Sequence, residues 1–152
     1  MNAKPILLAT CLFPFAAMAC GADDGMAFSC TTTKGKYVEV CQTPKEVTYS
    51  FGKLGQKPEM NLRVPTAQLD WTTSGGSGMN FDTITFHNGK TAYMLDIESE
   101  FGTDDGSGQG SKPATTATLN VRNGTTSLAT LECEQKGLQK RLERLTASPR
   151  AE

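Results

Sequence analysis

The sequence predicts an all-β protein: a small antiparallel β-barrel, or a sandwich, of about seven or eight strands. Two observations lead to this fold class. Apolar and polar residues alternate with a period of two along most of the chain, and the alternating segments are separated by Gly- and Asn-rich turn signals. Short strands at regular spacing are typical of small antiparallel barrels and sandwiches.

Residues 1–19 have the pattern of a secretory signal peptide. Lys4 is the only charge in this stretch, an apolar run extends from Ile6 to about Met18, and Ala17-Met18-Ala19 is a small-x-small cleavage signal. The run is shorter than the roughly 20 apolar residues that a membrane span needs. We therefore expect a periplasmic or secreted protein with no transmembrane segment.

Cys20 directly follows the expected cleavage point and leaves two states open. A lipoprotein signal also places Cys there, because its thiol takes the lipid, but that signal usually has Leu where this chain has Ala17. We expect ordinary cleavage, with a lipid on Cys20 and an anchor in the cell envelope as the alternative. The protein would touch a membrane only in that second case.

The composition and motifs argue against several classes of function. The net charge is −1 at pH 7, whereas nucleic-acid binders are normally strongly basic. The single histidine, His87, lies beside a turn signal and is expected to be solvated. No nucleophile motif, phosphate loop or CxxC pair is present, and Asp104-Asp105 lacks the spacing of an EF-hand. We expect no enzyme activity, no cofactor and no metal.

The alternation also places the individual strands. Residues 47–51 and 60–64 each read as a strand with one buried and one wet face. Three hairpins are expected at turn signals, because an Asn-Gly pair provides the positive φ angles of a type I′ turn. They join 27–33 to 36–41 at Lys34-Gly35, 80–87 to 90–98 at Asn88-Gly89, and 115–122 to 125–133 at Asn123-Gly124.

Two-residue turns would fix the pairing inside these hairpins. In the second hairpin Ile84 would lie opposite Tyr93, on one buried face. In the third hairpin Leu119 would lie opposite Leu128. A bulge between 128 and 131 would then be needed to keep Leu131 on the buried face.

The remaining segments are expected to be less regular. Residues 65–73 would form a short strand or a loop carrying Trp71, and residues 99–114 a long loop rich in Gly, Ser and Asp. Residues 20–133 would make one β domain. Residues 134–152 would be a basic tail or a short surface helix, because leucines recur there at helical spacing among Lys and Arg.

The cysteines of the mature chain point to disulfides, as an exported protein allows. Cys30 lies in the first strand and Cys133 at the end of the last, and these strands are neighbours in a closed barrel. We expect a Cys30–Cys133 disulfide that closes a loop of about 100 residues. A Cys30–Cys41 bridge would need a different turn, since diagonal positions lie roughly 7–8 Å apart. Cys41 is then free or pairs with Cys20.

An acidic run follows the second hairpin. Asp96, Glu98 and Glu100 have the same parity and would share one strand face, with no Lys or Arg among them. One interpretation is a solvated edge that discourages strand addition. The other is a patch that steers a basic partner toward the protein.

The order of these features resembles the bacterial membrane-bound or periplasmic inhibitors of c-type lysozyme. The resemblance covers roughly residues 28–133. It includes Phe28-Ser29-Cys30 with the Lys-Gly-Lys that follows, a Ser-Gly-x-x-aromatic stretch at residues 77–81, and the late Cys133. It implies a small antiparallel barrel with a disulfide between its terminal strands. It also implies a Ser-Gly-x-x-Tyr loop whose Ser hydroxyl bonds a catalytic carboxyl group in the lysozyme cleft.

The expected function is therefore an exported protein-binding domain, with a basic c-type lysozyme as the partner. The loop of residues 74–81 would enter the cleft, with Phe81 where the family has Tyr. The residues expected to contact the partner are Ser77, Gly78, Phe81, Asp96 and Glu98. The alternatives are a structural or lipoprotein-like domain of the cell envelope without inhibitory activity, and a small-molecule carrier that uses the barrel interior.

Overall fold

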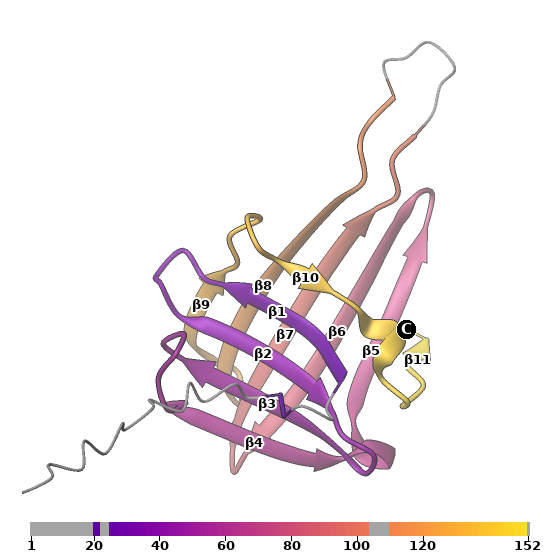
Figure 1. Cartoon of the computed structure of the whole chain (residues 1–152). Coiled ribbons are helices and arrows are strands. Elements are labelled where there is room, and N and C mark those ends of the chain that lie inside the picture. Colours follow the sequence, from indigo (N-terminus) through magenta and orange to yellow (C-terminus); the bar gives the residue numbers. More distant parts are fainter. Residues whose placement is uncertain (1–19, 22–24, 104–109, 152) are drawn as a thin grey trace, which may run out of the picture.

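The computed structural model describes residues 20–21, 25–103 and 110–151 (Figure 1). Nine strands of six to ten residues and two strands of two residues form two sheets in this part of the chain. The predicted all-β class is confirmed. The arrangement is sandwich-like and not a closed barrel, and it has one long strand more than expected, because residues 70–76 form a strand of their own.

The first sheet has five strands in the order β10-β1-β2-β3-β4, and the second has six in the order β11-β5-β6-β7-β8-β9. All neighbouring strands are antiparallel except β11 and β5, which are parallel. The bounds are Gly25–Thr31 (β1), Tyr37–Gln42 (β2), Glu46–Gly52 (β3), Met60–Pro65 (β4), Asp70–Gly76 (β5), Met79–Asn88 (β6), Thr91–Glu100 (β7), Ala114–Asn123 (β8), Thr126–Glu132 (β9), Gln139–Lys140 (β10) and Arg150–Ala151 (β11), with short 3-10 turns at Thr66–Gln68 (η1) and Leu142–Arg144 (η2).

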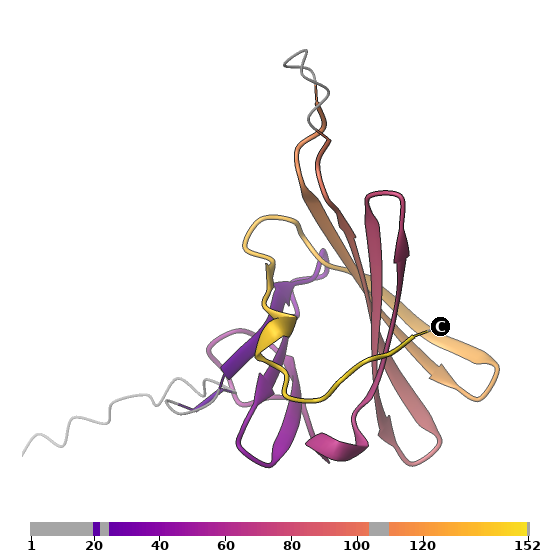
Figure 2. The same cartoon turned by 90° about the vertical axis from the view of Figure 1, so that its right-hand side faces the viewer.

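The core lies between the two sheets and follows the period-two pattern of the sequence. Alternate residues of each strand point inward, and the ring of Tyr49 from β3 stacks on Phe86 from β6 with centroids 5.1 Å apart. Figure 2 shows the two sheets facing each other, with the C-terminal segment running between them. The fully buried side chains that fill the core include Phe28, Val38, Val40, Val47, Tyr49, Ile84, Leu95, Ile97 and Leu119.

The second and third hairpins have the predicted faces but a different register. Ile84 lies opposite Leu95, two residues from the predicted partner, and Leu119 lies opposite Leu131. In both turns glycine takes the first central position, with φ of 60° at Gly89, as in type II′ turns, whereas a type I′ turn would place it second. A shift by two residues keeps the side chains on their predicted faces, except that Leu128, predicted opposite the buried Leu119, is exposed.

Two bulges and a longer turn account for the other differences in pairing. The first hairpin turns through Thr33–Gly35 instead of two residues, so Cys30 lies opposite Val38 and not Glu39. The bulge expected in the third hairpin is present at Leu128, which is skipped in the pairing with β8 and is exposed. A second bulge, at Ala27 in β1, was not predicted.

The Cys30–Cys133 disulfide is confirmed, and Cys41 pairs with Cys20. The first bridge joins β1 of the first sheet to the end of β9 in the second, and Thr32 pairs with Cys133 beside it. The terminal strands are thus neighbours at this point, as a barrel would place them, although the sheets remain separate along the rest of their length. The second bridge holds Cys20 against the outer face of β2.

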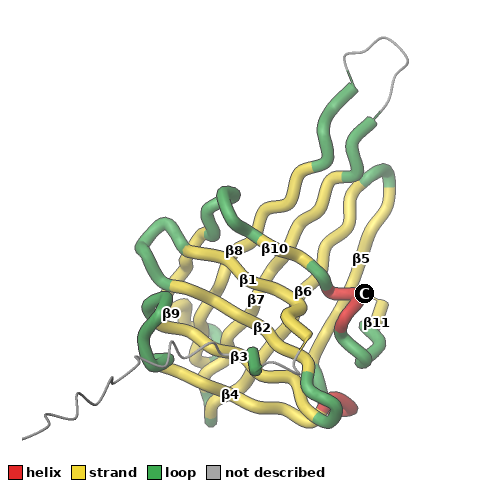
Figure 3. The backbone as a smooth tube through the Cα atoms, viewed as in Figure 1, coloured by secondary structure: helices red, strands yellow, loops and turns green. Residues whose placement is uncertain are grey.

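Residues 134–151 are not a separate tail or surface helix. After β10 pairs with β1, Leu142 in the 3-10 turn η2 and Leu145 directly after it are buried in the core, and the chain then reaches β5 of the other sheet. Figure 3 shows this segment as short strands joined by loops and one helical turn. The spacing of its leucines predicts a helix, but Leu142 and Leu145 instead cover the open side of the sandwich.

Two expectations fall outside the described residues, namely the signal peptide over residues 1–19 and the calcium question at Asp104-Asp105. Within the described ranges, no helix has the length and apolar character that crossing a membrane requires.

Candidate functional site

The Ser-Gly pair singled out in the sequence forms the tip of a β-hairpin. Ser77 and Gly78 have φ angles of 51° and 85°, which is the pattern of a type I′ turn. Strands β5 and β6 stay paired up to Gly76 and Met79, directly beside the turn. The expected loop over residues 74–81 is therefore a regular hairpin, and Figure 1 shows it extending past the first sheet.

One glycine next to the tip is required by packing. A Cβ on Gly75 would lie 2.8 Å from Asn80 Oδ1 and 2.9 Å from the carbonyl oxygen of Met79. Both are closer than real Cβ atoms approach, and the carbonyl cannot move without breaking the hairpin. The neighbouring Gly76 has nothing within 4 Å of that position. The first glycine thus lets the two strands pack closely, and the second leaves the edge of β5 uncovered.

A buried polar network supports the inner face of the hairpin. The side chain of Asp82 is 5% exposed and receives three donors. Trp71 Nε1 donates to Oδ1 over 3.2 Å, and Asn80 Nδ2 donates to Oδ2 over 2.8 Å. Lys140 Nζ, from β10 of the first sheet, donates to Oδ2 over 2.8 Å and to Ser99 Oγ over 2.8 Å. The hairpin is thereby fixed to both sheets below its tip.

The contact between Ser99 and Lys140 has the spacing of a Ser–Lys catalytic pair but not its chemistry. Lys140 donates to the carboxylate of Asp82 as well as to Ser99, and an ammonium group has no lone pair with which to accept the serine proton. Ser99 is also buried. We therefore interpret this cluster as structural.

The outer face of the second sheet brings Phe81 and Glu98 together. They lie opposite each other on β6 and β7, and Phe81 is 44% exposed. Glu98 has no hydrogen-bond or ionic partner among the described residues, so its carboxylate faces solvent. A shallow hollow between β6 and β8 is lined by Phe81, Thr83, Asp96, Glu98 and Thr116.

Asp96 belongs to the same face but is engaged within the sheet. Thr83 Oγ1 donates to its Oδ1 over 2.7 Å, and Asn120 Nδ2 donates to its Oδ2 over 2.8 Å. Thr130 Oγ1 then donates to Asn120 Oδ1 over 2.9 Å, so the chain of bonds crosses four strands. This carboxylate holds the sheet together and is less available to a partner than Glu98.

The acidic residues do not lie on a sheet edge. β7 is paired on one side with β6 and on the other with β8 along its whole length. The interpretation of a solvated edge that discourages strand addition is therefore wrong. Glu98 and Glu100 form an acidic surface in the middle of the sheet, beside the hairpin tip.

Phe101, which no sequence pattern singled out, lies against the tip. Its backbone N–H donates to the carbonyl of Gly78 over 2.8 Å, and its ring is 60% exposed. It has the parity of the inward-facing Ile97 and Ser99, but β7 has by then passed beyond the first sheet (Figure 1). The sequence signal that could have identified Phe101 is an apolar residue directly after the alternating strand.

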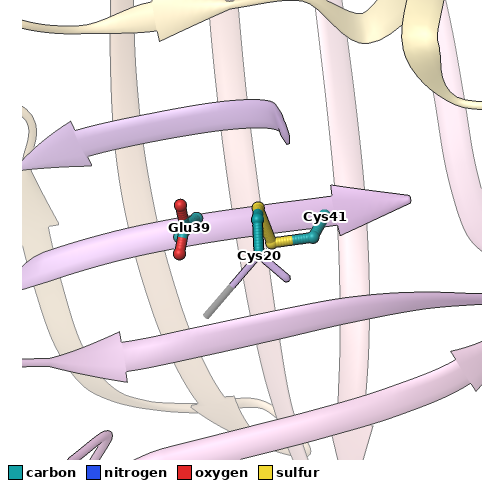
Figure 4. Close-up of side chains that lie close together, drawn as sticks. All are labelled: Cys20, Glu39 and Cys41. Carbon is teal, nitrogen blue, oxygen red and sulfur yellow. A yellow bond between two sulfur atoms is a disulfide. The ribbon is translucent and has the colours of Figure 1, made fainter. Parts of the chain in front are cut away.

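A second cluster, on the outer face of the first sheet, is explained by its disulfide. The Sγ atoms of Cys20 and Cys41 and a carboxylate oxygen of Glu39 lie within 4.8 Å of one another (Figure 4). Sulfurs joined in a disulfide are not thiolates and do not ligate a metal in that state. A lipid would need the same sulfur of Cys20, so the disulfide and lipidation exclude each other.

His87 lies on the exposed surface, as expected. Its Nε2 is 3.8 Å from Asp70 Oδ2, and Arg150 pairs with the other oxygen of Asp70. This group lies at the opposite end of the hairpin from Ser77.

Comparison with family models, with curated proteins and with solved structures finds no match to this chain. The geometry of the hairpin tip therefore carries the functional argument.

Proposed function

We propose that this chain is an exported protein-binding domain that holds a basic partner at the tip of the β5–β6 hairpin and on the acidic face beside it. The observation that carries the proposal is the exposed Phe81 next to the unpaired carboxylate of Glu98, on a hairpin that extends past the first sheet. Exposed aromatic side chains are frequent centres of protein interfaces. The two disulfides are compatible with an extracellular or periplasmic location.

The tip is preorganised for binding. Its turn has only two residues, its strands are paired to the last residue, and Asp82 fixes its base through three hydrogen bonds. A rigid element loses little conformational entropy when it binds. Glu98 and Glu100 would increase the rate of encounter with a positively charged protein.

A c-type lysozyme is the partner that this proposal names first, on the basis of the sequence resemblance. A glycosidase cleft contains two carboxyl groups, one of them protonated. The hydroxyl of Ser77 at the end of a narrow hairpin can bond such a group and offers the enzyme no glycosidic bond to cut. Phe81 supplies the aromatic contact without the hydroxyl of a tyrosine.

The test measures inhibition of a c-type lysozyme and, separately, binding to it. We expect Ser77→Ala and Glu98→Gln each to weaken inhibition by about tenfold, which corresponds to about 1.4 kcal/mol. Added salt should weaken the wild type more than Glu98→Gln. Glu46→Gln, which removes one charge from the first sheet, is the matched control and should have no effect. If a large excess of the protein neither binds nor inhibits lysozyme, this partner is rejected.

A further inference from the structure

In the described part of the chain, the edge of β5 is only partly covered by another strand. The two-residue strand β11 runs parallel to β5 and pairs Arg150 with Thr72 and Ala151 with Thr73. Toward the tip, no strand among the described residues pairs with this edge at Ser74–Gly76. Among the described residues, no strand pairs with the backbone groups that face away from β6 there, so they can accept a further strand.

This part of the edge lacks the features that keep sheet edges unpaired. Natural edges are protected by charged side chains, proline, bulges or a covering segment. The edge strand β4 has Arg63 and ends at Pro65, and the edge strand β9 has a bulge at Leu128. Ser74–Gly76 has no charge, no proline and no bulge.

A shallow hollow lies directly beside this edge. It is lined by Ser74, Gly76, Met79, Phe101 and the last described residue, Ala151. The glycines contribute no side chain that would block an approaching backbone, and the ring of Phe101 offers an apolar surface. The hollow therefore continues the path that β11 takes along β5.

We propose that Ser74–Gly76 is a strand-addition site, at which an extended segment of a basic partner protein continues the sheet in line with β11. The inference deepens the proposed function and rests on it, because it states how the partner is held. Backbone hydrogen bonds would provide affinity and alternate side chains would provide specificity. Residues of the partner on the inner side would contact Phe101.

The charge of the outer face selects the partner. Ser74, Phe81 and Glu98 lie in one row across β5, β6 and β7. The small side chain of Ser74 leaves room for an Arg or Lys of the added strand to extend over the ring of Phe81 toward Glu98.

The experiment measures amide hydrogen exchange of the whole protein with two separate probes. One probe is a c-type lysozyme, and the other is a short synthetic peptide of alternating Thr and Val with two Arg residues, in large excess. We expect slower exchange at Ser74–Gly76 with at least one probe, and no change at the edge strand β4, which serves as the internal control.

Two N-methylated forms of the peptide separate backbone pairing from side-chain contact. Methyl groups on one edge of the peptide remove the hydrogen bonds to β5, and the same number on the other edge leaves them intact. We expect one form to bind about tenfold more weakly than the unmodified peptide, a loss of about 1.4 kcal/mol, and the other to bind nearly as well. Equal loss in both forms would overturn strand addition.

The two probes also separate this inference from the proposed partner. Lysozyme binding with protection of Ser74–Gly76 by neither probe supports the proposed function and overturns strand addition at this edge. Protection by the peptide alone supports strand addition, and it rejects lysozyme as the partner where lysozyme also fails to bind. Protection by neither probe overturns strand addition. Protection that rises with protein concentration in the absence of a probe also overturns it, because the edge then pairs two copies.

Discussion

Replacing Lys140 with methionine tests whether the buried network below the hairpin holds the two sheets together. The substitution keeps much of the side-chain volume and removes the ammonium group that Asp82 and Ser99 share. Asp82 would keep only its two neutral donors, Trp71 and Asn80.

The magnitude follows from burial. Removing one member of a buried ion pair typically costs ~3–5 kcal/mol, because the other charge is left without compensation. The side chain of Asp82 is 5% exposed, but that of Lys140 is 21% exposed, so water can reach the vacated position in part. We therefore expect the lower end, about 3 kcal/mol of unfolding free energy, and a fall in Tm of about 10 °C.

Urea unfolding of the wild type, Lys140→Met, Asp82→Asn and the double variant gives the coupling free energy between Lys140 and Asp82 directly. The double variant should be more stable than the sum of the single losses predicts, by at least about 1.5 kcal/mol. Lys136→Met, an exposed lysine in the same segment, is the control and should cost less than about 0.5 kcal/mol. Additive single effects would show that the pair does not couple the sheets.

Three further predictions concern stability. Replacing Cys30 and Cys133 with serine should lower the free energy of urea unfolding by up to about 4.7 kcal/mol, because this bridge spans 103 residues. Loss of the Cys20–Cys41 bridge, which spans 21 residues, should lower it by about 3 kcal/mol. A larger loss from the shorter bridge would contradict the loop-entropy argument. The Tyr49 hydroxyl is buried and has no hydrogen-bond partner among the described residues. Burial raises the pKa of its phenol far above the usual value of 10.0, so the unfolded chain loses this proton first and stability falls as the pH rises above about 10. Tyr49→Phe should remove that part of the pH dependence and leave neutral stability unchanged or higher by about 1 kcal/mol, and an unchanged alkaline profile would refute the assignment. Gly75→Ala should lower the free energy of unfolding by about 1–3 kcal/mol, because the added methyl crowds the hairpin. Gly76→Ala should lower it less. Faster amide exchange across β5 and β6 would measure both losses.

Much of the architecture could be predicted because period-two patterns specify faces. Ile84 and Tyr93 were expected on one buried face, and they remain there although neither has its predicted partner. A register error of two residues leaves each side chain on the same face of the sheet. The turn type does not follow from an Asn-Gly pair, since glycine can occupy either central position of a primed turn.

The missed features depend on contacts between distant parts of the chain. The sequence leaves residues 65–73 as a short strand or a loop and predicts a loop from residue 74. Residues 70–76 become one strand because β6 and Arg150–Ala151 flank them. Asp82 and Lys140 are 58 residues apart, and nothing local indicates that they form a buried pair. The leucines near the end suggested a helix, although their role is to fill the open side of a sandwich.

At the candidate site, sequence reasoning identified residues but not their roles. Ser77, Gly78, Phe81 and Glu98 are exposed or partly exposed on and beside one hairpin. Asp96 proved to be a cross-strand connector, because its hydrogen bonds depend on the pairing of β7 with β6 and β8. Phe101 was absent from the expected set, since its exposure is set by where the first sheet stops.

The C-terminal segment carries a consequence for biogenesis. The core lacks Leu142 and Leu145, and the sheets lack the ion pair between Lys140 and Asp82, until residues 140–145 have joined them. A nascent chain that is still emerging therefore has an unfinished interior and stays pliable. In the export that we propose, that delay would leave the polypeptide open enough to be threaded through a translocation pore.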